Sequence, residues 1–258
     1  MRKSVIEQLT RSNIKTNTLR RKIACMKVFY NYLKYQNIIE ETPFNQLRFQ
    51  FRTEKILPKT IPYDILKRIF IYLEQKVIVS KTDYQKQHAE RNLLIISLLL
   101  STGIRISELC HIHLKDINLS NKTLHIIGKG KKERILFLGD QKTFNLLETY
   151  INKTRNESND FLFPGKYPLK PLSEQSVRLV IKRIVEQNNF SRSITPHMFR
   201  HSFATMLLDS DVDIRYIQQI LGHSSISITQ IYTHVSHSKQ KEILSSFNPV
   251  SAIHSEIE

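Results

Sequence analysis

The sequence predicts a mainly α-helical protein with one small antiparallel β-sheet. In most segments between turns, apolar residues recur at steps of three and four, which is the period of an amphipathic helix. One segment, residues 122–139, instead alternates apolar and β-branched residues on both sides of a glycine–lysine turn, as a β-hairpin does. Hydrophobic residues make up 40% and charged residues 24% of the 258-residue chain, so an ordinary globular core is expected.

The first expected element is an amphipathic helix over residues 17–38. Its apolar face consists of residues at steps of four and three, namely Leu19, Ile23, Met26, Tyr30 and Leu33. On another face, Arg20, Lys27 and Lys34 recur every seven residues. A basic stripe opposite an apolar one suits a helix that packs on its own domain and faces a phosphate backbone. A merely solvated face is nearly as consistent with this helix alone.

A change in composition follows this helix. Residues 50–62, with the sequence QFRTEKILPKTIP, are polar, contain two prolines and have no clear period, so we interpret them as a linker. We therefore predict a short helical domain in residues 1–50, a linker in residues 51–61 and a larger unit in residues 62–258.

The larger unit is expected to begin with a helix over residues 62–75, followed by a polar loop over residues 80–90. The apolar run Leu93–Leu100 comes next. It is far shorter than the ~20 residues that span a bilayer, so it predicts a buried helix. Gly103 then predicts a turn before a short helix.

The hairpin of residues 122–139 has at most one partner strand in the sequence, and a helix over residues 140–156 follows it. Three later helices are indicated by their end residues. Ser173 is a typical N-cap, Thr195 with Pro196 is typical of a helix start, and Gly222 is typical of the position after a helix end.

The charge of the chain indicates a polyanionic partner. Lys and Arg number 39 against 23 Asp and Glu, which gives a net charge of +16. Residues 1–60 contain 13 of the basic and 4 of the acidic side chains, so this quarter of the chain has a surplus of +9. Nucleic acid is the commonest partner of such a distribution.

The cysteines and the N-terminal residues indicate a cytoplasmic protein without a membrane association. Cys25 and Cys110 lie far apart and have neither a pairing nor a metal-binding spacing, as expected of a reduced compartment. The first residues, MRKSVIEQLTRSN, lack the continuous apolar stretch of a secretory signal.

The segment TPHMFRHSFAT, residues 195–205, contains the first candidate for chemistry. His197 and Arg200 are three residues apart in the first turn of the expected helix, where free backbone N–H groups and the helix dipole favour an anion. His201 lies four residues after His197, so a zinc pair is the alternative. The segment lacks the glutamate of H-E-x-x-H, has an arginine beside the histidines and suggests no third ligand, so no metal is expected.

Two further segments contain candidate residues. The hairpin tip GKGKKER contains Lys129, Lys131 and Lys132 but lacks G-x-x-x-x-G-K-[ST], which excludes a nucleoside triphosphate site. This basic turn suits a DNA groove or simple solvation. In TGIRISEL, Arg105 precedes Glu108 by one helical turn, as in an ordinary surface ion pair or in a carboxylate that fixes a catalytic guanidinium.

Taken in order, these segments resemble the motifs of the tyrosine recombinases, or phage integrases. Four segments are similar to that family's motif boxes: TGIRISEL, GKGKKER, TPHMFRHSFAT and LGHSSISITQIYTHVS. Their sequences look closest to those of its Xer-like branch. The resemblance covers roughly residues 57–247 and, more loosely, the first 50 residues. It implies the tyrosine recombinase catalytic fold preceded by a shortened helical DNA-binding domain.

The resemblance implies a role for each matching residue. Tyr232 would be the nucleophile that forms a 3′-phosphotyrosine link, and His197 would be its acid or base. Arg105 and Arg200 would clamp the phosphate, and Glu108 would orient Arg105. Lys129, in the hairpin, would protonate the leaving 5′-oxygen, and His223 would donate a hydrogen bond to the same phosphate. This chemistry uses neither a metal nor another cofactor.

The resemblance also implies double-stranded DNA as the partner and a homotetramer on two DNA sites, with an accessory protein as a further option. Residues 236–250 would dock onto a neighbouring protomer or pack within their own chain. The N-terminal domain is about half the family's usual length. A DNA-binding relative without chemistry is therefore the alternative function, while a relaxing topoisomerase and a zinc hydrolase are less favoured.

Overall fold

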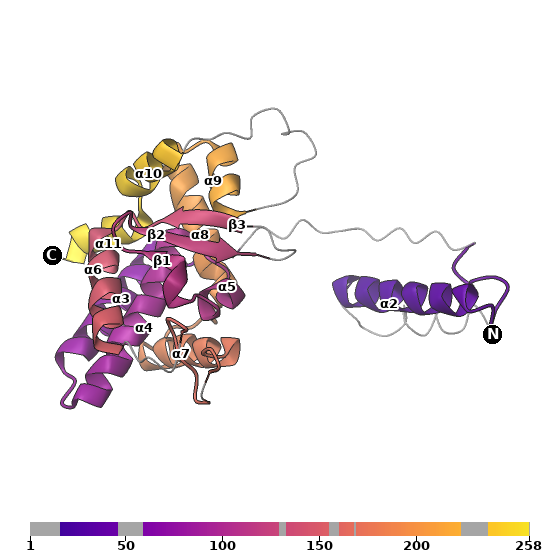
Figure 1. Ribbon diagram of the computed structural model, residues 1–258, viewed down its shortest axis with the longest axis horizontal. Helices are drawn as coiled ribbons and strands as arrows, with labels where there is room; N and C mark the ends of the chain where they lie inside the picture. The colour runs from indigo at the N-terminus through magenta and orange to yellow at the C-terminus, as the bar shows by residue number, and fades with distance from the viewer. Residues whose placement is uncertain are drawn as a thin grey trace. The chain divides into compact units, whose positions relative to one another are not determined.

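The structure is a computed structural model that describes residues 16–45, 59–128, 133–154, 160–167, 169–222 and 237–257. It divides into two compact units, with the division between residues 57 and 58. Most of the described residues of both units are helical, and the larger unit contains a three-stranded antiparallel sheet (Figure 1). The predicted fold class, mainly α with a small antiparallel sheet, is confirmed.

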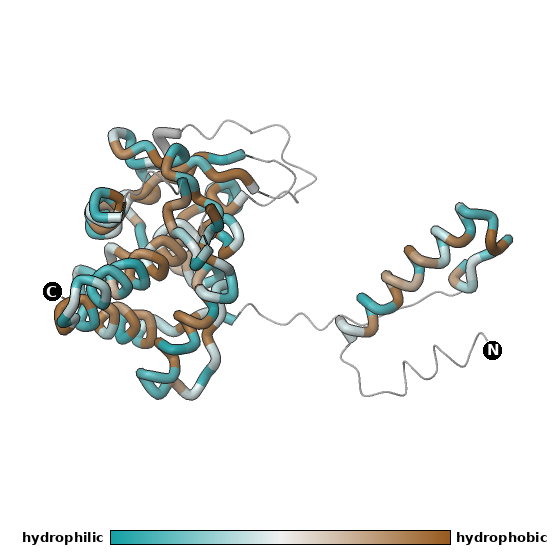
Figure 2. The backbone as a smooth tube through the Cα atoms, turned by 60° about the horizontal axis from the view of Figure 1, so that its bottom comes forward, coloured by the Kyte–Doolittle hydropathy of each residue, from teal (hydrophilic) through white to brown (hydrophobic). Residues whose placement is uncertain are grey.

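The described part of the N-terminal unit is built on α2, Thr16–Tyr35. Apolar and polar stretches alternate along its tube in Figure 2, as expected of an amphipathic helix. The predicted apolar face is the less exposed one, with Leu19 and Ile23 buried. The helix ends three residues before the predicted end, and Asn37 then takes a left-handed conformation with φ 54°.

The larger unit contains nine further described helices of the α type. In chain order they are α3 Tyr63–Ile78, α4 Asp83–Thr102, α5 Ile106–Cys110, α6 Gln141–Thr154, α7 Glu174–Gln187, α8 Pro196–Asp209, α9 Ile214–Leu221, α10 His237–Ser246 and α11 Pro249–Ile257. A 3₁₀ turn, Leu114–Asp116, follows α5. The core forms around α4, which packs against α3, α6, α8 and α11.

The predicted polar loop over residues 80–90 is wrong, because α4 already begins at Asp83. The Thr82 hydroxyl caps this start by accepting a hydrogen bond from the Gln85 N–H at 3.2 Å. Glu90 is buried and accepts a hydrogen bond from Lys153 of α6 at 2.8 Å. The first two turns have almost no apolar residues, so the hydrophobic period gave no sign of them. The apolar part of α4 is buried as predicted.

The sheet has the order β1–β2–β3, with β1 Ile117–Asn118, β2 Thr123–Ile127 and β3 Glu133–Phe137. The predicted hairpin is therefore formed, together with one short partner strand. In Figure 1 the sheet crosses the middle of the larger unit. Leu124, Ile126 and Leu136 are buried on its inner face, and the residues between them point outward with the period of two that a strand imposes.

The C-terminal helices pack within their own chain. Ile243 and Leu244 of α10 and Val250 and Ile253 of α11 are buried. The Asn248 amide donates a hydrogen bond to the Ser101 carbonyl oxygen at 3.3 Å. The described part of residues 236–250 therefore contacts its own chain, and docking onto a neighbouring protomer stays a prediction. Among the described residues, no helix is both long and apolar enough to cross a membrane.

Candidate active site

The first site residue, Arg105, lies in the turn between α4 and α5. Gly103 ends α4 in a left-handed conformation with φ 61°, and an added Cβ there would come within 2.5 Å of the Phe203 ring. Arg105 is the N-cap of α5, and its backbone N–H and Nη1 donate hydrogen bonds to the two carboxylate oxygens of Glu108 at 3.0 and 2.9 Å. The predicted Arg105–Glu108 pair is therefore formed.

The pair is not an ordinary surface ion pair. The Glu108 side chain is only 4% exposed, whereas the Arg105 side chain is 33% exposed. Burial alone would raise the pKa of Glu108, but hydrogen bonds from Arg134 and Arg105 outweigh it and hold the pKa at about 2. Glu108 is thus a fixed negative charge that anchors a partly exposed guanidinium.

Arg134 of β3 contacts these candidate site residues, and the sequence prediction did not include it. Its Nη1 and Nη2 donate to the two oxygens of Glu108 at 3.0 and 2.8 Å, and its Nε donates to the Ile220 carbonyl oxygen at 3.1 Å. Arg134 was visible as the last residue of GKGKKER. The strand pattern contained one signal for Arg134, because Arg134 lies two residues before Leu136 and therefore on the same inward face of β3. A buried arginine requires a partner of opposite charge.

Arg200 of α8 is buried beside these residues. Its Nη1 donates to the Gly103 carbonyl oxygen at 2.6 Å, and its Nη2 donates to the Leu221 carbonyl oxygen at 2.7 Å. Burial, followed by the neighbouring charges of Arg105 and Arg134, lowers the pKa of Arg200 to about 10. The guanidinium therefore stays charged at neutral pH, in a place where further positive charge is unfavourable.

The cluster of Arg105, Glu108, Arg134 and Arg200, here called the arginine cluster, has an excess of positive charge. It contains three guanidinium groups and one carboxylate, so its net charge is +2. An anion near Arg105 and Arg200 would relieve the repulsion that lowers the pKa of Arg200. A phosphodiester has the charge and the oxygen geometry that guanidinium groups bind best.

His197 lies in the first turn of α8, exposed, three residues before Arg200. Pro196 occupies the first helical position as predicted, and Thr195 is the N-cap by position but makes no capping hydrogen bond through its side chain. His201 is also exposed. Its pKa is lowered by partial burial and then by the nearby His197 and Arg200. Both histidines thus lie at the positively charged end of α8.

The remaining predicted site residues lie outside the described residues or on the N-terminal unit. Lys129, Lys131, Lys132, His223 and Tyr232 are outside the described residues, in the loop between β2 and β3 and in the segment after α9. The basic residues predicted on the N-terminal helix, Arg20, Lys27 and Lys34, are exposed side chains of α2. Within the described ranges, no group of three or more His, Cys, Asp or Glu residues could hold a metal ion.

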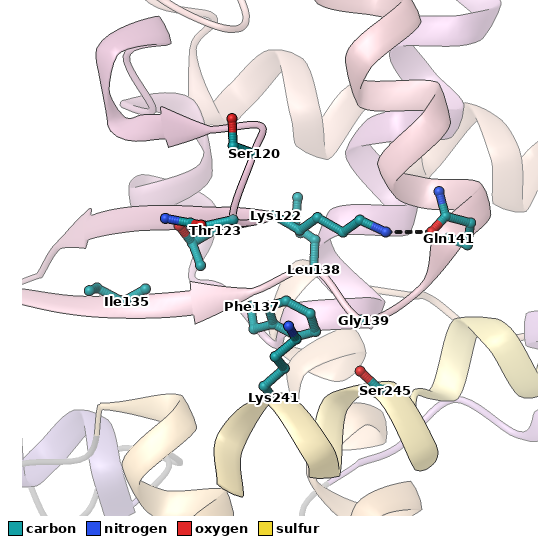
Figure 3. Close-up of a pocket in the computed structure, with 11 residues that line it drawn as sticks. Ser120, Lys122, Thr123, Ile135, Phe137, Leu138, Gly139, Gln141, Lys241 and Ser245 are labelled. Atoms are coloured by element: carbon teal, nitrogen blue, oxygen red, sulfur yellow. Dashed lines mark hydrogen bonds between the residues drawn. The ribbon is translucent and has the colours of Figure 1, made fainter. Parts of the chain in front are cut away.

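A pocket of about 630 Å³ lies on the outer face of the hairpin, lined by β2, β3, the β3–α6 turn and α10 (Figure 3). Ile135 and Phe137 line it, so it lies on the strand face opposite Arg134. Lys122 donates a hydrogen bond to Gln141 at 2.6 Å, and Lys241 lies over the Phe137 ring. None of the described candidate site residues lines this pocket.

The comparisons with known proteins agree with this geometry. Residues 72–239, more than half of the chain, match the Phage integrase family. A tyrosine recombinase of Agathobacter rectalis is 49% identical over 243 residues, which is 93% of this chain and 79% of the relative. Tyrosine recombinase XerC of Bacillus subtilis is 34% identical, over 90% of this chain and 75% of the relative.

Solved structures show the same fold. The XerH site-specific recombinase, bound to a palindromic difH substrate in a post-cleavage complex, superposes with a TM-score of 0.69 at 24% identity, over 95% of this chain and 72% of that one. An integrase from mycobacterium phage Brujita superposes with a TM-score of 0.57 at 20% identity, over 100% of this chain and 83% of that one. The chain therefore belongs to the phage integrase family and to the Xer-like branch of its tyrosine recombinases, which act in site-specific recombination of DNA.

Proposed function

We propose that this recombinase cleaves and rejoins DNA through a 3′-phosphotyrosine intermediate formed on Tyr232. The observation that supports the proposal best is the arginine cluster. Arg105 and Arg200 are charged guanidinium groups, each held in place by protein oxygens, in a cluster whose net charge is +2. A fixed pair of guanidinium groups is suited to the charge that builds on phosphate oxygens in a transition state.

In the proposed step one phosphodiester bond is exchanged for another, so no external energy source is needed. The Tyr232 oxygen attacks the phosphorus, the new oxygen–phosphorus bond forms, and the bond to the 5′-oxygen breaks. His197 accepts the phenolic proton, which has a pKa near ~10 in free tyrosine, and Lys129 donates a proton to the 5′-oxygen. Arg105, Arg200 and His223 bind the non-bridging oxygens. Attack of a 5′-hydroxyl reverses the step and joins a new strand.

We further propose that residues 1–50 form a DNA-binding domain and residues 62–258 the catalytic domain, with 51–61 as the linker. The exposed lysines and arginine of α2 and the surplus of +9 in residues 1–60 support a contact with the phosphate backbone. The lysines of the hairpin tip suit the same partner. We place the reaction on two double-stranded DNA sites in the cytoplasm, performed by four protomers, with an accessory protein as an optional component.

Covalent trapping tests the proposed function. Purified protein is incubated with nicked duplexes made from the DNA that flanks its gene, and a covalent protein–DNA adduct is measured by its shift in a denaturing gel. We expect wild-type protein and Tyr167→Phe to form the adduct, because Tyr167 is an exposed loop residue. Tyr232→Phe is expected to form none.

Two outcomes would contradict the proposal. An adduct that persists in Tyr232→Phe would show that another residue is the nucleophile. Binding of the flanking DNA by wild-type protein without any adduct would favour a DNA-binding relative that has lost its chemistry. Sequencing of the trapped DNA ends would define the recombination site in the same experiment.

A further inference from the structure

Arg134 is the one arginine of the described cluster whose guanidinium is fully occupied by protein oxygens at all three nitrogens. Nη1 and Nη2 form a two-pronged contact with Glu108, and Nε donates to the Ile220 carbonyl oxygen. Its side chain is 12% exposed, compared with 33% for Arg105. Arg134 is therefore poorly placed to bind a phosphate itself, and any effect on the reaction must act through the groups that it holds.

The first of these groups is Glu108. Each carboxylate oxygen accepts one hydrogen bond from Arg105 and one from Arg134. Because Arg134 neutralises Glu108, the charge of Arg105 remains available to an anion outside the pair. Without Arg134, the carboxylate would instead cancel the charge of Arg105, and the net charge of the cluster would fall from +2 to +1. Glu108 would also lose the two bonds that fix its orientation.

The second group is the C-terminal end of α9. Helices end with carbonyl groups that have no partner within the helix, and here Arg134 binds that of Ile220 while Arg200 binds that of Leu221. Gly222 follows in a left-handed conformation with φ 64°, and an added Cβ there would lie 3.1 Å from the Arg134 side chain. Arg134 and Arg200 thus fix the same helix end from two sides.

We infer that Arg134 is a positioning residue for strand cleavage, which rests on the proposed function. It joins three elements of the larger unit: β3, the α5 turn with Arg105 and Glu108, and the end of α9. Its first role is to fix Glu108, so that Glu108 orients the Arg105 guanidinium without cancelling its charge. Its second role is to link Glu108 to the end of α9 through the Ile220 carbonyl oxygen. It does not itself touch the phosphate.

The test separates cleavage from binding. Four variants are compared with wild-type protein: Arg134→Gln, Arg134→Lys, Glu108→Gln and the double variant Glu108→Gln with Arg134→Gln. Three quantities are measured for each: the single-turnover rate of adduct formation with DNA bound at saturation, the DNA dissociation constant and the thermal unfolding midpoint. Arg178→Gln is the matched control, since Arg178 forms an exposed ion pair with Glu174 within α7.

We expect Arg134→Gln to lower the cleavage rate by about 100-fold, the size of effect that follows from small misplacement of catalytic groups. The dissociation constant should change less than about threefold, because other residues make the DNA contacts. Arg134→Lys restores the positive charge beside Glu108 without the two-pronged contact, so it should cleave about tenfold faster than Arg134→Gln. Arg178→Gln should retain the wild-type rate.

The double variant shows whether Arg134 acts through Glu108. Its rate should be no lower than that of the slower single variant, because both changes remove the same interaction. If Arg134→Gln does not fold, the rate and affinity of Arg134→Lys decide the question, with a cleavage defect of about tenfold expected at unchanged affinity.

Three outcomes would overturn the inference. The first is a wild-type cleavage rate in both Arg134 variants. The second is a loss of DNA affinity in the Arg134 variants as large as their loss of cleavage rate. The third is a loss of rate in the double variant equal to the product of the losses in its two single variants. Absence of an adduct with wild-type protein would overturn the proposed function as well. A wild-type adduct with unaffected Arg134 variants would overturn the role of Arg134 alone.

Discussion

Glu108 is the residue on which the described arginine cluster depends. It is a buried carboxylate that accepts four hydrogen bonds from two arginines, and no other carboxylate of the described residues contacts either arginine there. Loss of one member of a buried ion pair costs more than the pair contributes, because the partners are left charged without compensation. The cluster should therefore be sensitive to the charge of Glu108 in stability as well as in catalysis.

We predict that Glu108→Gln lowers the free energy of unfolding by about 3–5 kcal/mol at neutral pH. The difference between wild-type and variant should depend on pH. The pKa of Glu108 is lowered from 4.5 to about 2 in the folded state, so its ionised form contributes stability above about pH 4.5. That contribution is lost as the pH falls from about 4.5 to about 2, where wild-type Glu108 becomes protonated and resembles glutamine.

Urea unfolding at a series of pH values measures this difference. Glu148→Gln is the control, since Glu148 is exposed on α6, and its unfolding free energy should stay within about 0.5 kcal/mol of wild type. A stability gap between wild type and Glu108→Gln that is the same at pH 3 and pH 7 would contradict the prediction.

At the scale of residues, the sequence predicted three of the four members of the cluster. Arg105 and Glu108 could be paired because a separation of three residues is one helical turn, and Arg200 could be placed from the start signal of its helix. Arg134 could not be found by local spacing, because it reaches Glu108 from a strand 26 residues away and Ile220 from 86 residues away. Only an inward-facing charge in the strand pattern indicated that it had a buried partner.

At the scale of elements, the turn between β3 and α6 determines where α10 packs. Gly139 lies against the backbone of α10, and an added Cβ would come within 1.8 Å of the Leu244 carbonyl oxygen. Figure 3 shows Gly139 and Ser245 facing each other across this contact. Any side chain at this position would have to push the helix away.

We predict that Gly139→Ala destabilises the protein by about 2 kcal/mol or more, because the obstacle is backbone and cannot rotate aside. The loss should concentrate in α10, whose buried Ile243 and Leu244 would be drawn away from the core. Amide hydrogen exchange of α10 should become faster in the variant, and urea unfolding should give the total change. Ser120→Ala, at an exposed position that lines the same pocket, should leave both unchanged.

A variant Gly139→Ala with wild-type stability would show that α10 can shift at little cost. The sequence could not reveal this contact, since Gly139 looks like an ordinary residue of a turn. The same limit applies to the first turns of α4, where a cap at Thr82 and the pairing of buried Glu90 with Lys153 replace the missing apolar period. Elements with a clear period, such as the hairpin and α7 with its Ser173 cap, were predicted correctly.

At the scale of the whole molecule, charge and core are distributed differently between the two units. The main hydrophobic core of the described residues extends from Ile61 to Ile253, entirely within the larger unit. None of the described residues of the N-terminal unit belongs to this core, but residues 1–57 contain 12 basic and 4 acidic side chains, and their surplus of +8 is half of the net charge of +16. Stability and electrostatic attraction to DNA should therefore be separable by deletion.

We predict that a fragment of residues 59–258 unfolds cooperatively, with a thermal midpoint within a few degrees of the full chain, because its core stays complete. Its DNA affinity should fall by about tenfold or more at 0.1 M salt. The slope of log K against log salt concentration should also become shallower, since each lost phosphate contact removes about 0.9 from its magnitude. Three lost contacts, one for each of Arg20, Lys27 and Lys34, would reduce it by about 2.7.

The full-length triple variant Arg20→Gln, Lys27→Gln, Lys34→Gln separates the stripe from the rest of the deleted segment. If the stripe makes the contacts, this variant should reproduce most of the change in slope while keeping the unfolding midpoint of the full chain. The matched control is the variant Arg21→Gln with Lys22→Gln, which should change the slope less. Arg21 and Lys22 are exposed residues of the same helix that lie outside the seven-residue repeat. An equal slope for the fragment and the full chain would show that the larger unit alone makes the phosphate contacts. The surplus charge of the N-terminal unit would then serve another partner.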